Sequence, residues 1–157
     1  MNSGRRKALQ GSGGAVVLGL AFAAGLFKPA SAWAQTWNKA AFDTKTLNDA
    51  VKAMGGTSAI ESKDITITSP DIAENGAVVP FTIASKIPKT ESIALMVEKN
   101  PNILVASFNI PDGTEPWVNT RAKMGQTSNV IALVKAGDGK YYYASKEVKV
   151  TLGGCGG

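Results

Sequence analysis

The chain has 157 residues, of which 44% are hydrophobic and 18% are charged, and it contains no histidine and one cysteine. Its formal net charge of +5 comes largely from residues 1–34, which hold no acid and four of the 17 basic residues: Arg5, Arg6, Lys7 and Lys28. The remaining 13 basic residues face 12 acidic ones, so this part has no excess charge of the kind that nucleic-acid binding requires. The lack of histidine also excludes ordinary zinc and haem ligand sets. We therefore expect no metal, no cofactor and no nucleic-acid partner.

The N-terminal segment has the three parts of a bacterial export signal. A basic start is followed by an apolar run over residues 15–27 and by the small-residue stretch 30–34. The run is too short and too interrupted by glycine for a membrane span. The adjacent Arg5 and Arg6 favour the twin-arginine route, which exports folded proteins, although two flanking positions depart from its usual pattern. Cleavage after Ala34 or two residues earlier would leave a periplasmic protein without a membrane anchor.

The first part of the predicted mature domain, residues 35–152, has helical periodicity. Apolar residues recur near helical spacing over residues 37–54, and Gly55 and Gly56 then end the pattern. We expect one amphipathic helix, or a pair of helices broken near Thr44.

The rest of the domain has the pattern of short β-strands, each bounded by Pro, Asn or Gly. Apolar or alternating runs occupy residues 65–68, 78–83, 93–97, 103–110, 130–134 and 141–152. The glycine-rich turn at residues 137–139 joins the last two runs as a hairpin. Six or seven strands at this spacing predict a mainly β domain, an immunoglobulin-like antiparallel β-sandwich with an N-terminal helical segment.

Residues 153–157 place the only cysteine among residues that lack side chains: Gly153, Gly154, Cys155, Gly156 and Gly157. Glycine loses more conformational entropy on ordering than any other residue, so we expect a flexible C-terminal arm that presents the thiol to partners. A disulfide within the chain is excluded by the cysteine count. An unpaired cysteine in an exported protein indicates an intermolecular bond or a reactive thiol.

Other residues have weaker claims to function. Three consecutive tyrosines at residues 141–143 could form a recognition patch, but aromatic residues in strands more often serve packing. Arg121 and Lys123 fit a solvated strand face better than an anion site, whereas Lys146 and Lys149 have a better claim as steering charges near the arm.

Two different functions fit the exposed thiol. The chain is a covalent sulfur carrier without catalytic residues, or it is a binding or structural module that uses Cys155 for an intermolecular disulfide. The terminal glycines also resemble those of ubiquitin-like sulfur carriers, but such carriers work with ATP in the cytoplasm. The tail has no cation to lower the pKa of the thiol, so its activation must come from a partner enzyme.

Three segments and the leader resemble the SoxY family, the sulfur-carrier subunits of the bacterial Sox system that oxidises thiosulfate. The segments are residues 94–108 (ALMVEKNPNILVASF), 121–134 (RAKMGQTSNVIALV) and 149–157 (KVTLGGCGG). The resemblance implies that Cys155 carries the substrate as a covalent adduct. It also implies a β-sandwich partner, SoxZ, and other Sox enzymes that load, hydrolyse and oxidise the cargo.

A heterodimer with a second sandwich would protect exposed strand edges. The apolar runs at residues 93–97 and 103–108 are the expected contact surface, because they hold more apolar residues than one buried face requires. In the alternative, both faces are covered within the domain, partly by the N-terminal helix.

Overall fold

The computed structural model of the chain describes residues 38–153, so the predicted export signal at residues 1–34 lies outside the described residues. Two helices come first, α2 (Lys39–Phe42) and α3 (Leu47–Ala53). Nine strands follow: β1 (Ala59–Glu61), β2 (Ile65–Thr68), β3 (Ile72–Asn75), β4 (Val79–Ser85), β5 (Thr90–Val97), β6 (Leu104–Asn109), β7 (Trp117–Ala122), β8 (Ser128–Ala136) and β9 (Tyr141–Leu152). In the described range, no helix is long and apolar enough to cross a membrane.

Local capping explains why the predicted helical segment is a pair of helices. The side chain of Asn38 accepts a hydrogen bond from the backbone N–H of Ala41 at the start of α2. Thr46 does the same for Asp49 at the start of α3. Gly55, with φ of 91°, follows the end of α3 in the left-handed conformation that glycine adopts most readily. The break between the helices lies at residues 43–46, so the expectation of a pair broken near Thr44 is confirmed.

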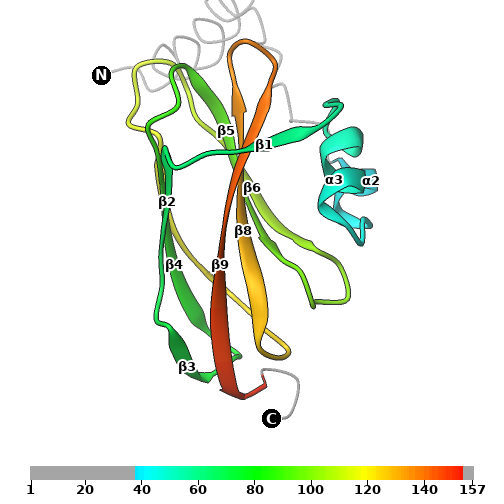
Figure 1. Ribbon diagram of the computed structural model, residues 1–157, viewed down its shortest axis with the longest axis vertical. Helices are drawn as coiled ribbons and strands as arrows, with labels where there is room; N and C mark the ends of the chain where they lie inside the picture. Colours follow the sequence, from blue (N-terminus) through cyan, green and yellow to red (C-terminus); the bar gives the residue numbers. More distant parts are fainter. Residues whose placement is uncertain (1–37, 154–157) are drawn as a thin grey trace, which may run out of the picture. The chain divides into compact units, whose positions relative to one another are not determined.

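The strands form two sheets that face each other, as the expected mainly β sandwich requires (Figure 1). The larger sheet has the order β1-β9-β8-β5-β6, with β3 also paired to β9, and the smaller has the order β2-β4-β7. The hairpin of β8 and β9 was expected from the turn at residues 137–139, and its register pairs Ser128 with Val148. Not every pairing is antiparallel, because the short strands β1 and β3 lie parallel to β9.

Two apolar clusters cover opposite faces of the larger sheet. One fills the space between the sheets and includes Phe81 of β4 and Leu95 of β5. The other lies beneath the helices and joins Val51 of α3 to Met96 of β5, on the side where Figure 1 shows α2 and α3. Alternate side chains of β5 therefore enter different clusters, and all five of residues 93–97 are fully buried. The expected partner surface is wrong for residues 93–97 and for Ile103 and Leu104, since the domain itself covers them.

The aromatic residues at 141–143 serve packing. Tyr141 is 2% exposed and belongs to the cluster beneath the helices, whereas Tyr142 and Tyr143 pack against the two clusters from their edges. The Tyr141 hydroxyl donates a hydrogen bond of 2.6 Å to the carbonyl oxygen of Met54, the residue that caps α3. This bond ties the helical pair to β9.

We predict that Tyr141→Phe lowers the free energy of unfolding by about 1–2 kcal/mol, because it leaves the carbonyl oxygen of Met54 without this partner in a partly buried place. Chemical denaturation measures the change. Tyr142→Phe is the matched control, one residue along the same strand and only half-buried; an equal loss in both variants would contradict the assignment.

The same variant also changes the pH dependence of stability. Burial raises the pKa of Tyr141 above its usual value, so the folded state favours the neutral phenol. The stabilisation that the neutral Tyr141 phenol provides is complete below the pKa of tyrosine in the unfolded chain, about 10. It is lost as the pH rises through the higher pKa that Tyr141 has in the folded state. The free energies of unfolding of wild type and Tyr141→Phe should therefore converge above pH 10.

Candidate functional site at the base of the arm

Only one residue of the expected carrier arm lies within the described residues. Cys155, with Gly154, Gly156 and Gly157, lies outside the described residues, so the prediction that they form a flexible carrier arm stays a prediction. Gly153 is described and directly follows β9. The structure therefore shows the base from which the chain runs toward the cysteine.

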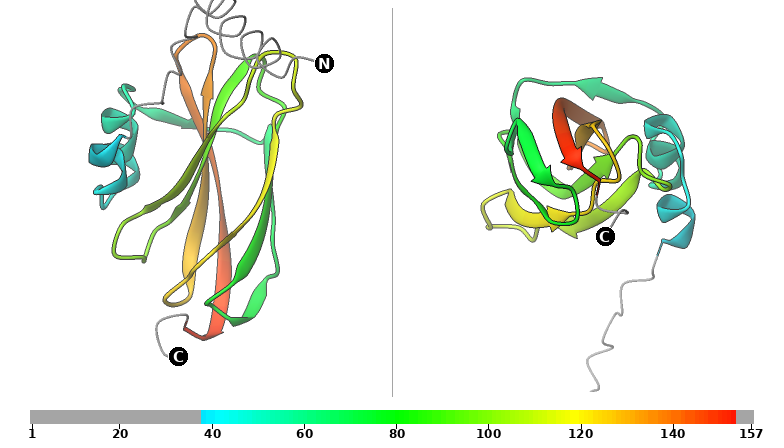
Figure 2. Two further views of the ribbon diagram at one scale, coloured as in Figure 1. Left: turned by 180° about the vertical axis from the view of Figure 1, so that it is seen from behind. Right: turned by 90° about the horizontal axis from the view of Figure 1, so that it is seen from below.

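The base lies where β9 ends beside β3, at the opposite end of β9 from its hairpin with β8 (Figures 1 and 2). Val148 is fully buried, Val150 is half-buried and Leu152 is 59% exposed, so packing decreases stepwise along the strand. Because Leu152 has so little packing around it, the order of the C-terminal end of β9 depends mostly on backbone hydrogen bonds.

Strand β3 holds one side of this end. It pairs Ala73 with Val150 and Asn75 with Leu152 in parallel register. Just past the strand, the backbone N–H of Gly76 donates a 2.8 Å hydrogen bond to the carbonyl oxygen of Leu152. The pairing thus continues to the last residue of β9.

On the other side of β9, Thr127 hydrogen-bonds the strand beyond the last residue pair that β8 and β9 form. The β8–β9 pairing begins at Ser128 opposite Val148, so it leaves Val150 without a backbone partner on β8. The Thr127 hydroxyl accepts a 2.9 Å hydrogen bond from the N–H of Val150 and lies 3.5 Å from its carbonyl oxygen. This side chain extends the ladder past the end of β8.

Gly153 packs closely against the loop that precedes β8. A Cβ atom built on Gly153 would overlap the carbonyl oxygen of Gly125 and lie 3.4 Å from its carbonyl carbon. The φ angle of Gly153 is not in the left-handed region, so the requirement for glycine here comes from the backbone of the loop and not from conformation. The first glycine after β9 is therefore part of the packed domain.

The loop that carries Gly125 is itself held from two directions. The Asn100 side chain accepts from the N–H of Gly125 at 3.2 Å and donates to the carbonyl oxygen of Lys123 at 2.8 Å. The N–H of Met124, a fully buried residue, donates to the carbonyl oxygen of Gly76 at 2.7 Å. Because Gly76 also binds Leu152, one peptide segment links the end of β9 to the loop.

The lysines near the arm have different environments. Lys146 donates to the carbonyl oxygen of Ser69 and forms a 2.9 Å ion pair with Asp71, so it serves the structure and is not a free steering charge. Its hydrogen bond lowers the pKa of the Asp71 carboxyl. Lys149 is exposed on β9, and its role as a steering charge stays a prediction.

Arg121 and Lys123 are also exposed at the end of β7 and just beyond it, which agrees with a solvated face.

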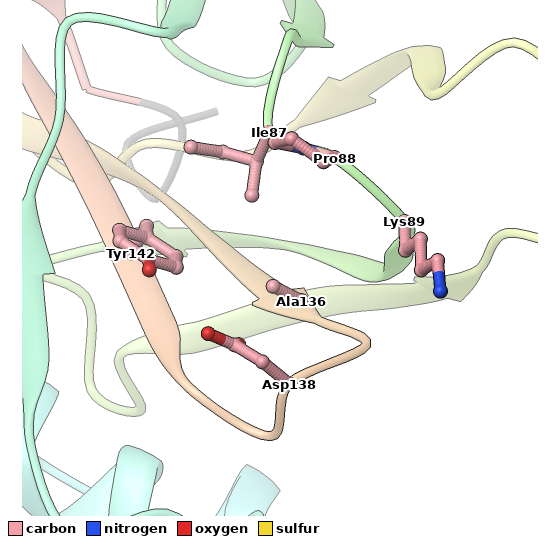
Figure 3. Close-up of a pocket in the computed structure, with 6 residues that line it drawn as sticks. All are labelled: Ile87, Pro88, Lys89, Ala136, Asp138 and Tyr142. Carbon is pink, nitrogen blue, oxygen red and sulfur yellow. The ribbon is translucent and has the colours of Figure 1, made fainter.

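A shallow pocket of about 270 Å³ lies at the other end of β9, beside its hairpin with β8 (Figure 3). Its lining is mostly apolar, with Ile87 and Tyr142 among the residues drawn. The Asp138 carboxylate accepts from the N–H of Lys140 within the turn, and the Lys89 amino group points away from it (Figure 3). The pocket thus brings no acid, base and nucleophile together.

Within residues 38–153, no group of three or more His, Cys, Asp or Glu side chains is placed to hold a metal ion. The residues of the base were not found from the sequence, because no motif or spacing relates Gly76, Asn100, Gly125 and Thr127.

Comparisons with known proteins agree on one family. The family model described as sulfur oxidation protein SoxY matches residues 51–155. The sulfur carrier protein SoxY from Chlorobium limicola f thiosulfatophilum is 44% identical in sequence, with a TM-score of 0.61 over 68% of this chain and 96% of that one. No curated protein sequence matches the chain. A superoxide reductase from Ignicoccus hospitalis is 18% identical over 55% of this chain and 79% of that one, with a TM-score of 0.49.

The family match includes the internal segments on which the resemblance was based and ends at Cys155. The resemblance drawn from the sequence is therefore confirmed.

Proposed function

The chain belongs to the SoxY family of sulfur oxidation proteins, and we propose that it is a periplasmic protein that holds thiosulfate-derived sulfur on Cys155 and presents it to partner enzymes. The observation that supports this most is the extent of the family match, which ends on the only cysteine of the chain. The described base supports it too, because the strand before the cysteine is ordered through Gly153.

The chemistry needs only one thiol. The Cys155 sulfur bonds to the outer sulfur of thiosulfate, and the thiol gives up its proton and two electrons to an acceptor on a partner redox enzyme. The product is a cysteine S-thiosulfonate. Hydrolysis by a second enzyme then places water oxygen on the sulfonate sulfur, which leaves as sulfate, and a persulfide remains on the protein. Without a second cysteine in the chain, no internal thiol can displace this cargo.

The carrier itself performs no catalytic step in this proposal. Partner enzymes supply the general base, the electron acceptor and the activation of the thiol, since the glycines around Cys155 offer none of these. The twin-arginine-like leader supports export of the folded chain to the periplasm.

We predict that Cys155→Ser abolishes loading with sulfur while the midpoint of thermal unfolding stays within about 2 °C, because a residue in a glycine tail contributes little packing. Loading is measured by intact mass after incubation of the variant with thiosulfate and the partner enzymes. Equal adduct on wild type and variant would contradict the proposal.

The partner we propose is a second β-sandwich subunit of the SoxZ kind, with β6 in the contact. This strand is one of the two edges of the larger sheet, and Val105, Ala106 and Phe108 remain half-buried on it. Free edges of this kind are normally protected by pairing or covering. Of the expected surface, only residues 105–108 are thus accessible, because Ile103 and Leu104 are buried like residues 93–97.

We predict that the mature chain copurifies with such a subunit as a heterodimer when the two are expressed together. Size-exclusion chromatography with light scattering measures the mass. A monomer at micromolar concentration, with no β-rich partner and no loss of stability when expressed alone, would show that the pairing is absent.

A further inference from the structure

The contacts around Gly153 form a clamp that the carrier chemistry does not by itself require. We define the arm-base clamp as Gly76, Asn100, Gly125 and Thr127, the four residues whose contacts hold the end of β9 or the loop beside it. We propose that this clamp positions the sulfur by fixing the pivot of the arm at Gly153. The inference rests on the proposed function, because it takes Cys155 as the cargo-bearing residue.

The clamp fixes Gly153 through contacts on both sides of the strand. Gly76 binds the carbonyl oxygen of Leu152 on one side, and Thr127 binds the N–H of Val150 on the other. Gly153 itself packs against Gly125 with no room for a Cβ atom. Displacement of the Gly125 loop would cost free energy, because the Asn100 side chain and the buried Met124 hold the loop in place through hydrogen bonds.

A pivot at Gly153 leaves the sulfur a short reach. Cys155 is two residues further on, so its Cα stays within about 7 Å of the Gly153 Cα at ~3.3–3.6 Å per residue. If the end of β9 were free from Val148 onward, the same limit would be roughly 24 Å. The shorter tether confines the cargo to a much smaller volume and so raises its effective concentration at an enzyme docked on this end of the domain.

The short distance between Gly153 and Cys155 also limits where a partner enzyme can bind. An active site that takes the cargo must come within two residues of Gly153, so the enzyme surface must meet the end of the domain around exposed Leu152. The clamp residues therefore act as positioning residues, which affect the cargo through the position of Gly153.

The test compares Thr127→Val with Thr127→Ser in the full mature chain bound to its partner subunit. Valine keeps the shape of threonine but removes the hydroxyl that accepts from Val150, whereas serine keeps the hydroxyl. Amide exchange by NMR should be about tenfold faster at Val150 in the valine variant, the size of one lost hydrogen bond. A nitroxide label on Cys155 should become more mobile in the same variant. The serine variant should match wild type in both measurements.

Function is read as sulfate release from S-thiosulfonate-loaded carrier by the hydrolytic partner enzyme. We expect kcat/KM to fall by about tenfold for Thr127→Val and to be restored in Thr127→Ser, with no decrease in the rate at which iodoacetamide alkylates unloaded Cys155. Gly153→Ala tests the same clamp from the β9 side, since its methyl group must displace Gly125, and it should also lower kcat/KM.

Unchanged exchange at Val150 would show that the hydroxyl does not hold the strand. Faster exchange with unchanged kcat/KM would show that the clamp does not position the cargo. Either result overturns the inference while leaving the carrier function intact. A wild-type chain that takes no adduct on Cys155 would overturn both, and the exchange data would then describe a clamp with nothing to position.

Discussion

The pairing of β9 on both sides is the constraint on which the rest of the structure depends. This strand of 12 residues is hydrogen-bonded to β8 along its first part and to β1 and β3 on its other side. Tyr141 at its start ties the helices to the sheet, and Thr127 continues its hydrogen bonding past the end of β8. One strand therefore connects the helical pair, both apolar clusters and the base of the proposed carrier arm.

This arrangement suits the proposed carrier, whose cysteine follows β9 by three residues in the sequence. In the proposed function, the domain holds the chain in place at Gly153, and the cargo is bound by the one thiol of the segment that follows. A carrier in a multi-enzyme pathway benefits from such a division, because several enzymes must reach the same atom in turn. The absence of other cysteines in the sequence removes thiols that would displace the proposed cargo.

Much of the fold could be predicted from the sequence, because the strands have clear apolar runs and the β8–β9 turn has Gly137 and Gly139. The short strands β1 and β3 were missed, since Ala59–Glu61 and Ile72–Asn75 lack the apolar alternation of Ile65–Thr68 and their parallel pairing is set by β9. The burial of residues 93–97 on both faces could not be decided, because it depends on where the helices pack. The base of the arm could not be predicted either. The roles of Thr127 and Gly125 depend on their contacts with Val150 and Gly153, which only the folded structure brings close to them.

The central claim is that Cys155 carries pathway intermediates, and the mass of the protein taken directly from cells tests it most directly. The protein would be isolated from cells that are oxidising thiosulfate, with free thiols blocked at lysis, and analysed intact before and after reduction. The account predicts adducts of sulfur and sulfonate on the peptide that contains Cys155, all removed by reductant. A chain found only as free thiol or as a disulfide-linked dimer under these conditions would contradict it and favour the structural-module alternative.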